Sequence, residues 1–343
     1  MRHAVIMAGG VGTRLWPVSR QNAPKQFQKL VGNKSLIEET FDRLSQVVDP
    51  KNIWVVTTSN YREITQSELP NIDPNHIIGE PEGRNTAAAV GYATLKVLEE
   101  DPGATISISP ADHYIGKTDA FVEVAGLAYE FFDDNPEYLV TIGIKPTEPH
   151  TGYGYIQIGK TIVGQVASVE RFVEKPDLET AKTFLQDPNY LWNGEYYFFS
   201  GEQMVKYFEQ FIPETLKLLQ EFVRNNDAEI YRQIPKESID TALAEKAEKL
   251  AVIAAELDWN DIGNWSALHD ILEGRGDLPE NHLSIDTTNT MVVPHDRLIA
   301  TIGIKNTIII DTGDALLVCN KEKVQSVKDL VDLLKENKKE HLL

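Results

Sequence analysis

The sequence contains a single cysteine, Cys319, in 343 residues. One thiol cannot form a disulfide within the chain, which excludes a disulfide-stapled secreted domain and fits a reducing compartment. Cys319 ends an apolar run that starts at Ala315, and we expect it to be buried. The sequence also lacks apolar runs of about 18 residues, and it lacks a charged leader followed by an apolar core. We therefore expect neither a membrane span nor a signal peptide, and a cytoplasmic location.

Positive charge is scarce in the chain as a whole. There are 33 Lys and Arg against 52 Asp and Glu, which gives a formal net charge of −19. Such an acidic chain is unsuited to general binding of nucleic acids or anionic membranes. It can still hold one anionic small molecule through locally placed cations. The first 37 residues reverse the overall balance, because they contain six Lys or Arg and no Asp or Glu.

This cationic segment contains a glycine-rich turn. A short apolar run at residues 3–7 predicts a buried strand, and three glycines follow within residues 9–12. Glycines let the backbone approach a ligand closely, and the N–H groups of such a turn suit an anion. Arg14 and Lys25 add two cations at the end of the turn and beyond it. The pattern predicts a phosphate-binding loop, and the alternative is an ordinary glycine turn after a first strand.

Two familiar phosphate motifs do not fit this turn. A P-loop needs a Gly-Lys-Ser/Thr triplet after its first glycine and four spacers, and no such triplet follows Gly9 or Gly10. The dinucleotide fingerprint needs a third glycine at the position that Leu15 occupies. A nicotinamide-dependent oxidoreductase is therefore a poor interpretation, and a different glycine-rich turn remains.

Short apolar runs alternate with helical patterns through the first two thirds of the chain. The alternation predicts an α/β, Rossmann-like fold with a mixed, mostly parallel sheet flanked by helices on both faces. Ligands of such sheets bind at the carboxyl ends of the strands, where the glycine turn and Asp112 both fall. The predicted strands are residues 3–7, 53–57, 104–109, 139–144, 153–158, 166–173, 191–199 and 251–257. The predicted helices are residues 35–48, 86–99, 120–132, 177–186, 202–222 with an interruption at Pro213, 239–249, and one that starts near Asn264.

The last part of the chain has a different pattern. Residues 273–289 are polar and predict a linker. Four short apolar runs follow at 290–293, 298–302, 307–311 and 315–319, and their close spacing predicts a small all-β unit coiled like a β-helix. Residues 323–337 predict a closing amphipathic helix. We therefore expect two domains, a large α/β domain at residues 1–280 and a small β-rich domain at residues 281–343.

Several motifs occur in order over nearly the whole chain. Gly-Gly-Val-Gly-Thr-Arg-Leu-Trp-Pro at 9–17 is followed by Pro-Lys-Gln-Phe at 24–27. Further motifs are Gly-Arg-Asn-Thr-Ala at 83–87, Pro-Ala-Asp-His at 110–113, Gly-Tyr-Gly-Tyr at 152–155, Phe-Val-Glu-Lys-Pro at 172–176 and Asp-Trp-Asn-Asp-Ile-Gly-Asn-Trp at 258–265. Together they resemble the sugar-nucleotide pyrophosphorylases, a nucleotidyltransferase family. Trp16, Ser19-Arg20 and the segment 25–27 are similar to the guanylyltransferase branch of that family.

The resemblance implies transfer of GMP from GTP to α-D-mannose 1-phosphate, giving GDP-mannose and pyrophosphate, with Mg²⁺ as cofactor. We also expect a homodimer, to which the small β unit would contribute; the alternative is that its strands serve only the monomer. Because the attacking phosphate oxygen is already an anion, no strong general base is needed, and positioning and electrostatics carry the catalysis. Asp112 and Asp261 would hold the metal, with Asp258 a weaker candidate for the second position. Taken alone, each aspartate could also be a turn or helix-cap residue.

The resemblance also implies the other site residues, and it identifies the domain of residues 1–280 as the nucleotidyltransferase catalytic domain. The catalytic residues would be Arg14, Lys25, Asp112 and Asp261. The nucleotide would be bound by Ala8, Gly9, Gly10, Gly12, Thr13, Arg14, Lys25, Glu80, Arg84, Asn85 and Asp112. The sugar phosphate would be bound by Gly154, Glu174, Lys175 and Asn193.

Some alternatives stay open at this point. Glu80 precedes Pro81 and could be an exposed turn residue instead of a base contact. Residues 192–196 depart from the family pattern, because a serine is missing and Glu195 is added. The acceptor could therefore be another sugar 1-phosphate, such as a manno-heptose or glucose derivative. The chain could also be a sugar-nucleotide sensor without activity, although it retains the charged residues of the catalytic set.

Overall fold

The computed structural model describes residues 1–276 and 281–343 and divides into two compact units. Unit 1 consists of Met1–Gly9, Thr40–Ala111 and Ile115–Trp259. Unit 2 consists of Gly10–Glu39, Asp112–Tyr114 and Asn260–Leu343. The predicted domain boundary between residues 280 and 281 lies at the edge of the undescribed residues 277–280 and stays a prediction, and the compact units divide the chain at other positions.

Unit 1 is built on a nine-stranded sheet with the order β3-β2-β1-β4-β9-β6-β10-β8-β7. The strands are β1 (Arg2–Met7), β2 (Ile53–Thr58), β3 (Ile77–Glu80), β4 (Thr105–Pro110), β6 (Leu139–Ile144), β7 (Tyr155–Val163), β8 (Val166–Val173), β9 (Tyr190–Ser200) and β10 (Leu250–Ala255). The pairings of β1 with β2 and β4, of β2 with β3 and of β6 with β10 are parallel, and β8 and β9 run opposite to the other strands. The prediction of a mixed, mostly parallel sheet is confirmed.

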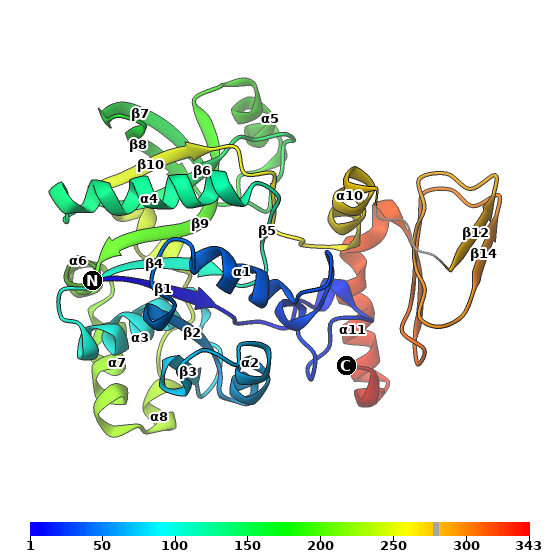
Figure 1. The fold of residues 1–343 in the computed structure, drawn as a ribbon, viewed down its shortest axis with the longest axis horizontal. Coiled ribbons are helices and arrows are strands. Elements are labelled where there is room, and N and C mark those ends of the chain that lie inside the picture. Colours follow the sequence, from blue (N-terminus) through cyan, green and yellow to red (C-terminus); the bar gives the residue numbers. More distant parts are fainter. Residues whose placement is uncertain (277–280) are drawn as a thin grey trace. The chain divides into compact units, whose positions relative to one another are not determined.

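Helices cover both faces of this sheet because its strands are buried on both sides. In β4, Ile106 and Ile108 belong to the apolar cluster that includes α3 and α6, while Ser107 between them accepts a hydrogen bond from Tyr129 of α4. Alternate residues of a strand point to opposite faces, so α3 and α4 lie on opposite faces. Helix α4 packs on β9 and β10, and α3 contacts β1 and β2 (Figure 1).

The longer helices of unit 1 follow the predicted pattern, whereas the short helices α2 (Arg62–Glu68) and α8 (Ala228–Tyr231) were not predicted and one predicted helix is too long. The other described helices are α3 (Asn85–Glu100), α4 (Thr118–Asp134), α5 (Leu178–Gln186), α6 (Gly201–Phe211), α7 (Pro213–Asn225) and α9 (Ile239–Ala242). The predicted helix at 239–249 is wrong beyond Ala242 except for a short 3-10 turn. The carbonyl of Lys249 accepts a hydrogen bond from the backbone of Leu139, so the chain has already entered the sheet there.

Helix α1 (Leu36–Leu44) crosses the division between the units and opens as predicted. The Ser35 hydroxyl accepts from the Glu38 backbone, and the Glu38 carboxylate accepts from the Ser35 backbone, which together form a capping box. The short strands β5 (Tyr114–Ile115) and β11 (Trp259–Asn260) lie where the chain passes from one unit to the other. Within residues 1–276 and 281–343, none of the helices is both long enough and apolar enough to span a membrane.

Unit 2 combines the opening loop with two helices and a coil of short strands. Its elements are α10 (Trp265–Arg275), β12 (His282–Ile285), β13 (Met291–Val293), β14 (Ile299–Ile302), β15 (Thr307–Asp311), β16 (Leu316–Asn320) and α11 (Val327–Glu336). Helix α10 begins after Asn264, whose side chain caps the backbone of Ser266 and Ala267, as the sequence predicted. Strand β12 lies inside the predicted linker, so that prediction is wrong for residues 282–285.

The strands of unit 2 form a regular coil. Residues His282 and Ile299 pair, as do Thr288 and Lys305, and Met291 and Ile308, so each pairing has the same offset of 17 residues. Parallel pairing at a constant offset is the geometry of a β-helix-like turn, which confirms the predicted β-helix-like domain. Strand β16 pairs with β15 at the end of its sheet, and Cys319 on it is half-buried rather than buried.

Candidate functional site

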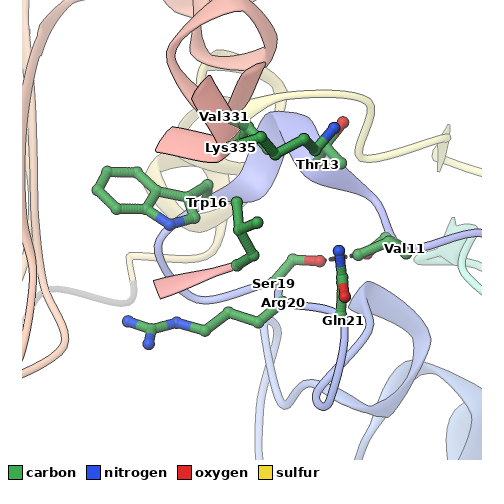
Figure 2. A pocket seen from close by; sticks show the side chains of 9 residues that line it. Val11, Thr13, Trp16, Ser19, Arg20, Gln21, Val331 and Lys335 are labelled. Carbon is green, nitrogen blue, oxygen red and sulfur yellow. Dashed lines mark hydrogen bonds between the residues drawn. The ribbon is translucent and has the colours of Figure 1, made fainter. Parts of the chain in front are cut away.

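The glycine turn of unit 2 is held by its carbonyl groups. The carbonyl of Val11 accepts hydrogen bonds from the Ser19 hydroxyl and from the Lys25 backbone N–H, and Figure 2 shows Ser19 directed at Val11. The carbonyl of Gly10 accepts from the Gln26 side chain at 3.3 Å. Gly10 and Gly12 have φ angles of +85° and +75°, which side chains rarely permit. The turn therefore has its acceptors bound by its own supporting residues.

The donors of the same turn are left for a ligand. The backbone N–H groups of residues 10–14 donate to no acceptor in the part of the chain that the structure describes. The Arg14 side chain is exposed and also has no hydrogen-bond or ion-pair partner among the described residues. A run of unpaired N–H groups beside a guanidinium is suited to a multiply charged anion. The predicted residues Gly10, Gly12, Thr13 and Arg14 are thus brought together.

Packing within unit 2 fixes the segment that follows the turn. The Trp16 indole N–H donates to the Leu342 carbonyl at 2.7 Å, and the Trp265 indole N–H donates to the Trp16 carbonyl at 2.9 Å. A cavity of about 120 Å³ lies beside the turn. It is lined by Val11, Thr13, Trp16, Ser19, Arg20, Gln21, Val331, Lys335 and Leu343 (Figure 2). The loop is therefore supported by residues from both ends of the chain.

Lys25 is buried directly against the turn. Its side chain is 7 % exposed, and a Cβ added to Gly12 would lie 2.5 Å from the Lys25 Cβ. Its Nζ donates to the Asp112 carboxylate at 2.8 Å and to the backbone carbonyl of Asp261. Three of the four predicted catalytic residues, which are far apart in the sequence, are thus in contact within one unit.

The two predicted metal carboxylates differ in their surroundings. Loss of solvation is the largest single influence on Asp112 and opposes its ionisation, but the charges of Lys25 and His113 and the hydrogen bonds to the carboxylate together outweigh it, so the pKa of Asp112 lies below its usual value. Asp112 is half-buried, with a side chain 34 % exposed. The Asp261 carboxylate accepts from the Gly263 backbone N–H at 3.0 Å, and a Cβ on Gly263 would lie 2.8 Å from it. Both residues supply hard oxygen donors, the kind that Mg²⁺ prefers.

Glu80 of unit 1 is buried, which decides against one of the two alternatives, while its contact with the base stays a prediction. It is only 4 % exposed, so the prediction of an exposed turn residue is wrong. Its carboxyl accepts from the Tyr231 hydroxyl at 2.5 Å and is also bonded to the backbone N–H of Arg84. Burial raises the pKa of Glu80 to about 7, and these two hydrogen bonds only partly oppose the effect. The carboxyl is bound within the protein and holds the loop that leads to α3.

The other predicted nucleotide residues of unit 1 have mixed surroundings. Arg84 forms an ion pair with Glu82 at 2.8 Å, and Asn85 has a φ of +67° at the start of α3. Ala8 directly follows β1, and both its N–H and its carbonyl are bonded to β2, at Val56 and Thr57. The backbone of Ala8 thus has no N–H left for a nucleotide, whereas Gly9 directly follows it.

A second group in unit 1 contains the predicted sugar-phosphate residues. The Lys175 ammonium donates to the Glu174 carboxylate, and Lys175 has a strained φ of +46°. A Cβ on Gly154 would lie 2.6 Å from Glu174 Oε2, so only glycine leaves room for that carboxylate. Burial opposes the charged form of Lys175, but the carboxylates of Glu174, Glu195 and Asp240 outweigh it and raise its pKa. Gly154, Glu174 and Lys175 are thus brought together.

Asn193 lies in the same group, but its amide is already occupied. Its Oδ1 accepts from Thr141 at 2.8 Å and from the Glu195 backbone at 3.3 Å, and its Nδ2 donates to Tyr197 at 2.8 Å and to Asp240 at 3.0 Å. These are all four hydrogen bonds that an amide side chain can make. The amide therefore has no spare group for a sugar hydroxyl in this structure, and the predicted contact stays a prediction.

Two residues of this group were missed by the sequence reasoning. Tyr197 and Asp240 are buried, and the Tyr197 hydroxyl donates to the Asp240 carboxylate. They are 43 residues apart and belong to different elements, so spacing could not pair them. Asp240 lies in a segment with a helical pattern, where one carboxylate does not indicate a buried partner. Only the fold shows that it faces Tyr197 of β9.

Comparison with known families and proteins supports this description. Residues 3–275 match a family model described as nucleotidyl transferase, and residues 280–334 match one described as a mannose-phosphate isomerase/GMP-like β-helix domain. A mannose-1-phosphate guanylyltransferase of Escherichia coli is 38 % identical over 98 % of this chain and 76 % of its own length. The xanthan biosynthesis protein XanB of Xanthomonas campestris is 37 % identical over 96 % of this chain and 73 % of its own length.

Solved structures give the same picture for the fold. A crystal structure from Thermus thermophilus, described as a mannose-1-phosphate geranyltransferase, superposes with a TM-score of 0.88 at 31 % identity. The match covers 97 % of this chain and 99 % of that one. A UDP-glucose pyrophosphorylase shares the fold at a TM-score of 0.52 and 16 % identity, over 80 % of this chain and 99 % of the other.

Proposed function

The chain belongs to the nucleotidyl transferase family, and from that premise we propose that it transfers GMP from GTP to mannose 1-phosphate, releasing pyrophosphate and forming GDP-mannose. The observation that carries the proposal is the turn of residues 10–14, with five unpaired N–H groups within the described residues, beside the contact of Lys25 with Asp112 and Asp261. The enzyme is a transferase, as are its named relatives.

The chemistry needs charge stabilisation rather than a strong base, because the attacking oxygen of the sugar phosphate is already an anion. The N–H groups of residues 9–13 would receive the triphosphate, and the Arg14 guanidinium would bind its outer oxygens with two parallel donors. Lys25 would neutralise the charge that develops at the α-phosphate. In the free protein its ammonium is kept in place by Asp112, which supports a preorganised role.

Asp112 and Asp261 are the residues that would hold Mg²⁺. Their donors fit the ion, since both are carboxylates and the lowered pKa of Asp112 keeps that group ionised at neutral pH. Mg²⁺ bound there would offset the negative charge of the phosphates. Lys25 contacts both residues, so the metal ligands and the cation would act on the same phosphate groups.

The acceptor is assigned to the group in unit 1. Lys175 would bind the phosphate of the sugar phosphate, and the Glu174 carboxylate would accept a hydrogen bond from a hydroxyl. Gly154 gives close access because its missing side chain leaves room beside Glu174. Arg84 and Asn85 would contact the base near α3, while Glu80 would act through the loop that it holds.

We extend the proposal to the organisation of the protein. The family matches at 3–275 and 280–334 support a catalytic domain of residues 1–280 and a β-rich domain of residues 281–343. The exposed apolar residues Leu283, Ile285 and Ile302 lie on the paired strands β12 and β14 and would form the interface of a homodimer.

A substrate panel tests the proposed reaction. The purified chain would be incubated with GTP, Mg²⁺ and one of three acceptors, the 1-phosphates of mannose, glucose and a manno-heptose, and pyrophosphate release would be measured. We expect mannose 1-phosphate to give the highest kcat/KM. A higher kcat/KM for glucose 1-phosphate or the manno-heptose 1-phosphate would identify that sugar phosphate as the acceptor instead of mannose 1-phosphate. Binding of GDP-mannose without turnover of any acceptor would instead indicate a sensor.

A further inference from the structure

A buried polar network lies within unit 1 next to the residues assigned to the sugar phosphate. The Asp240 carboxylate accepts from the Tyr197 hydroxyl and from the Asn193 amide, the latter at 3.0 Å. Asn193 in turn accepts from Thr141 at 2.8 Å. Asn193, Tyr197 and Asp240 are 3 %, 2 % and 7 % exposed, so bulk water does not compete for these bonds.

The network fixes the position of Gly154 through the backbone. The Asn193 backbone N–H donates to the Gly154 carbonyl at 2.8 Å, and β7 pairs with β9 at the adjacent residues Tyr155 and Trp192. Gly154 is in turn the residue against which the Glu174 carboxylate rests. A shift of Asn193 would therefore move Gly154 and change the space available to Glu174.

The other end of the network is held by α3. The backbone of Ile239 donates to the Thr86 hydroxyl at 2.8 Å, and the backbone of Ala87 donates to the Glu237 carbonyl at 3.1 Å. These bonds hold α9 at the start of α3, so Asp240 has a fixed position relative to β9. The network is thus supported from two sides within the same unit.

Asp240 also contributes charge at this place. Burial raises the pKa of Asp240, the Tyr197 hydrogen bond opposes this shift, and the neighbouring Glu174 adds to it. Asp240 belongs to the carboxylates that surround the Lys175 ammonium. A buried carboxylate without a directly bonded cation is costly, and here two donors bound to it offset that cost.

We propose that Tyr197 and Asp240 are a positioning pair for the acceptor, which orients Asn193 and Gly154 so that Glu174 and Lys175 can receive the sugar 1-phosphate. Neither side chain touches the substrate in this proposal. Both act through Asn193. They accept the two hydrogen bonds of its amide nitrogen, and its backbone N–H donates to the Gly154 carbonyl. The inference rests on the proposed function, because it assigns the acceptor to Glu174 and Lys175.

The first test compares two tyrosine variants of the full chain. Tyr197→Phe removes the hydroxyl that donates to Asp240, and Tyr129→Phe removes a hydroxyl of the same unit that is hydrogen-bonded to the His3 backbone carbonyl and the Ser107 hydroxyl. Tyr197→Phe also removes the acceptor of the Asn193 amide. We expect it to raise the KM for mannose 1-phosphate at least about tenfold and to leave the KM for GTP within about twofold. Tyr129→Phe should lower the melting temperature without changing either KM.

The second test separates geometry from charge at Asp240. Asp240→Asn keeps an oxygen that can accept from Tyr197 and Asn193, whereas Asp240→Ala removes it. We expect Asp240→Ala to raise the KM for mannose 1-phosphate at least about tenfold and Asp240→Asn to restore it to within about threefold of the wild type. Equal KM values for the two variants would contradict a positioning role.

The outcomes distinguish the inference from the proposed function. If the wild-type chain turns over GTP and mannose 1-phosphate but Tyr197→Phe leaves the acceptor KM unchanged, the positioning pair is wrong and the function stands. If Tyr129→Phe raised the KM for mannose 1-phosphate as much as Tyr197→Phe, the effect would be general destabilisation, and the proposed role of the positioning pair would be wrong. No turnover by the wild type with any acceptor would contradict the proposed function itself.

Discussion

At the scale of single residues, the position of Lys25 determines what its removal should do. The ammonium is buried and bonded to Asp112 and to the backbone of Asp261. Loss of one such transition-state stabiliser typically costs about 2.7–4 kcal/mol, so we expect Lys25→Ala to lower kcat by about 100- to 1000-fold. The far-ultraviolet circular dichroism spectrum should stay that of the wild type, because the carbonyl groups of the turn keep the Ser19 and Gln26 bonds.

Lys29→Ala is the matched control for this variant. Lys29 is exposed and lies four residues further along the same cationic segment, so the control removes an equal charge outside the contact with Asp112. We expect its kcat to stay close to that of the wild type. A kcat for Lys25→Ala within a few-fold of the control would exclude a role for Lys25 in charge stabilisation.

The assignment of the metal to Asp261 leads to a second prediction. Asn retains the size and one oxygen of Asp but loses its charge, so Asp261→Asn should require at least about tenfold more Mg²⁺ for half-maximal rate. Asp258→Asn is the control, since Asp258 was the weaker candidate and has a φ of +51° that Asn tolerates. The Mg²⁺ concentration for half-maximal rate is obtained for both variants from steady-state rates over a magnesium titration. If only Asp258→Asn required more Mg²⁺, the second metal ligand would be Asp258 and not Asp261.

Glu80 predicts a specific dependence of stability on pH. Its pKa is raised from 4.5 to about 7, so the folded state holds a proton on Glu80 that the unfolded state releases between these values. Protonation of Glu80 therefore contributes about 3 kcal/mol to the free energy of unfolding below about pH 4.5, and this contribution is lost as the pH rises through 7. Between pH 4.5 and 8 the wild type should therefore lose more unfolding free energy in urea than Glu80→Gln, which cannot titrate.

Glu82→Gln is the control for that experiment. Glu82 lies in the same loop, and its side chain is 38 % exposed and paired with Arg84. We expect Glu82→Gln to follow the pH profile of the wild type. Parallel profiles for wild type and Glu80→Gln would show that Glu80 titrates at the same pH in the folded and unfolded states.

The sequence could predict residues whose role depends on local chemistry, and it could not predict those whose role depends on burial. Lys25, Asp112 and Asp261 were found through motifs, and the structure places them in contact. Tyr197 and Asp240 were missed because their partners lie in distant elements. For Glu80, an exposed turn residue stayed open as the alternative to a base contact, because a charged side chain before a proline gives no sign of its hydrogen bond with Tyr231, 151 residues away.

At the scale of elements, the glycine turn is defined by both backbone conformation and space. Gly12 combines a φ of +75° with a Cβ position 2.5 Å from Lys25, whereas Gly164 has a φ of +52° and open space around it. Alanine at either position should destabilise the protein by about 1–2 kcal/mol through backbone strain. Only Gly12→Ala also displaces Lys25, so we expect it alone to lower kcat at least about tenfold.

Melting temperatures and steady-state rates of the two alanine variants separate these effects. Both melting temperatures should fall, and the rate should fall only for Gly12→Ala. A similar loss of rate in Gly164→Ala would mean that strain alone lowers activity. The pair therefore tests whether the turn serves to hold Lys25 as well as to present its N–H groups.

Long elements with a clear period were predictable, and short ones were not. Strand β6 is buried throughout and apolar except for Thr141, and its predicted range is also its observed range. Strand β3 has four residues and α2 has seven, which is too short for a period to show, and both were missed. Strand β12 was taken for a linker because half of its pattern is polar, although its parallel pairing with β14 defines a turn of the coil.

At the scale of the whole molecule, the compact units do not follow the predicted domains. The sequence suggested one boundary near residue 280, where the composition changes. The apolar core of unit 2 combines Leu15 and Trp16 with Tyr114, Trp265 and Ile308, so three separate stretches of chain share one core. Composition describes neighbours along the chain, and it cannot show which distant segments bury their apolar residues together.

The proposed homodimer is also a statement about the whole molecule. Ile285 and Ile302 are directly paired between β12 and β14 and are 61 % and 70 % exposed. Exposed apolar faces of this kind are typical of interaction sites. We expect the wild type to have the mass of a dimer by light scattering and the double variant Ile285→Lys, Ile302→Lys to have the mass of a monomer. Leu178→Lys, an exposed apolar position on α5, should leave the mass unchanged.

The shared core of unit 2 has a consequence for how the protein is synthesised. Residues 10–39 leave the ribosome early, but the partners of Leu15 and Trp16 within 260–343 follow more than two hundred residues later. At roughly 5–20 residues per second, this delay is on the order of ten to forty seconds. During translation the glycine turn is therefore part of a chain whose core is incomplete, and it reaches its ligand-binding conformation only after synthesis of the C-terminal coil and helix.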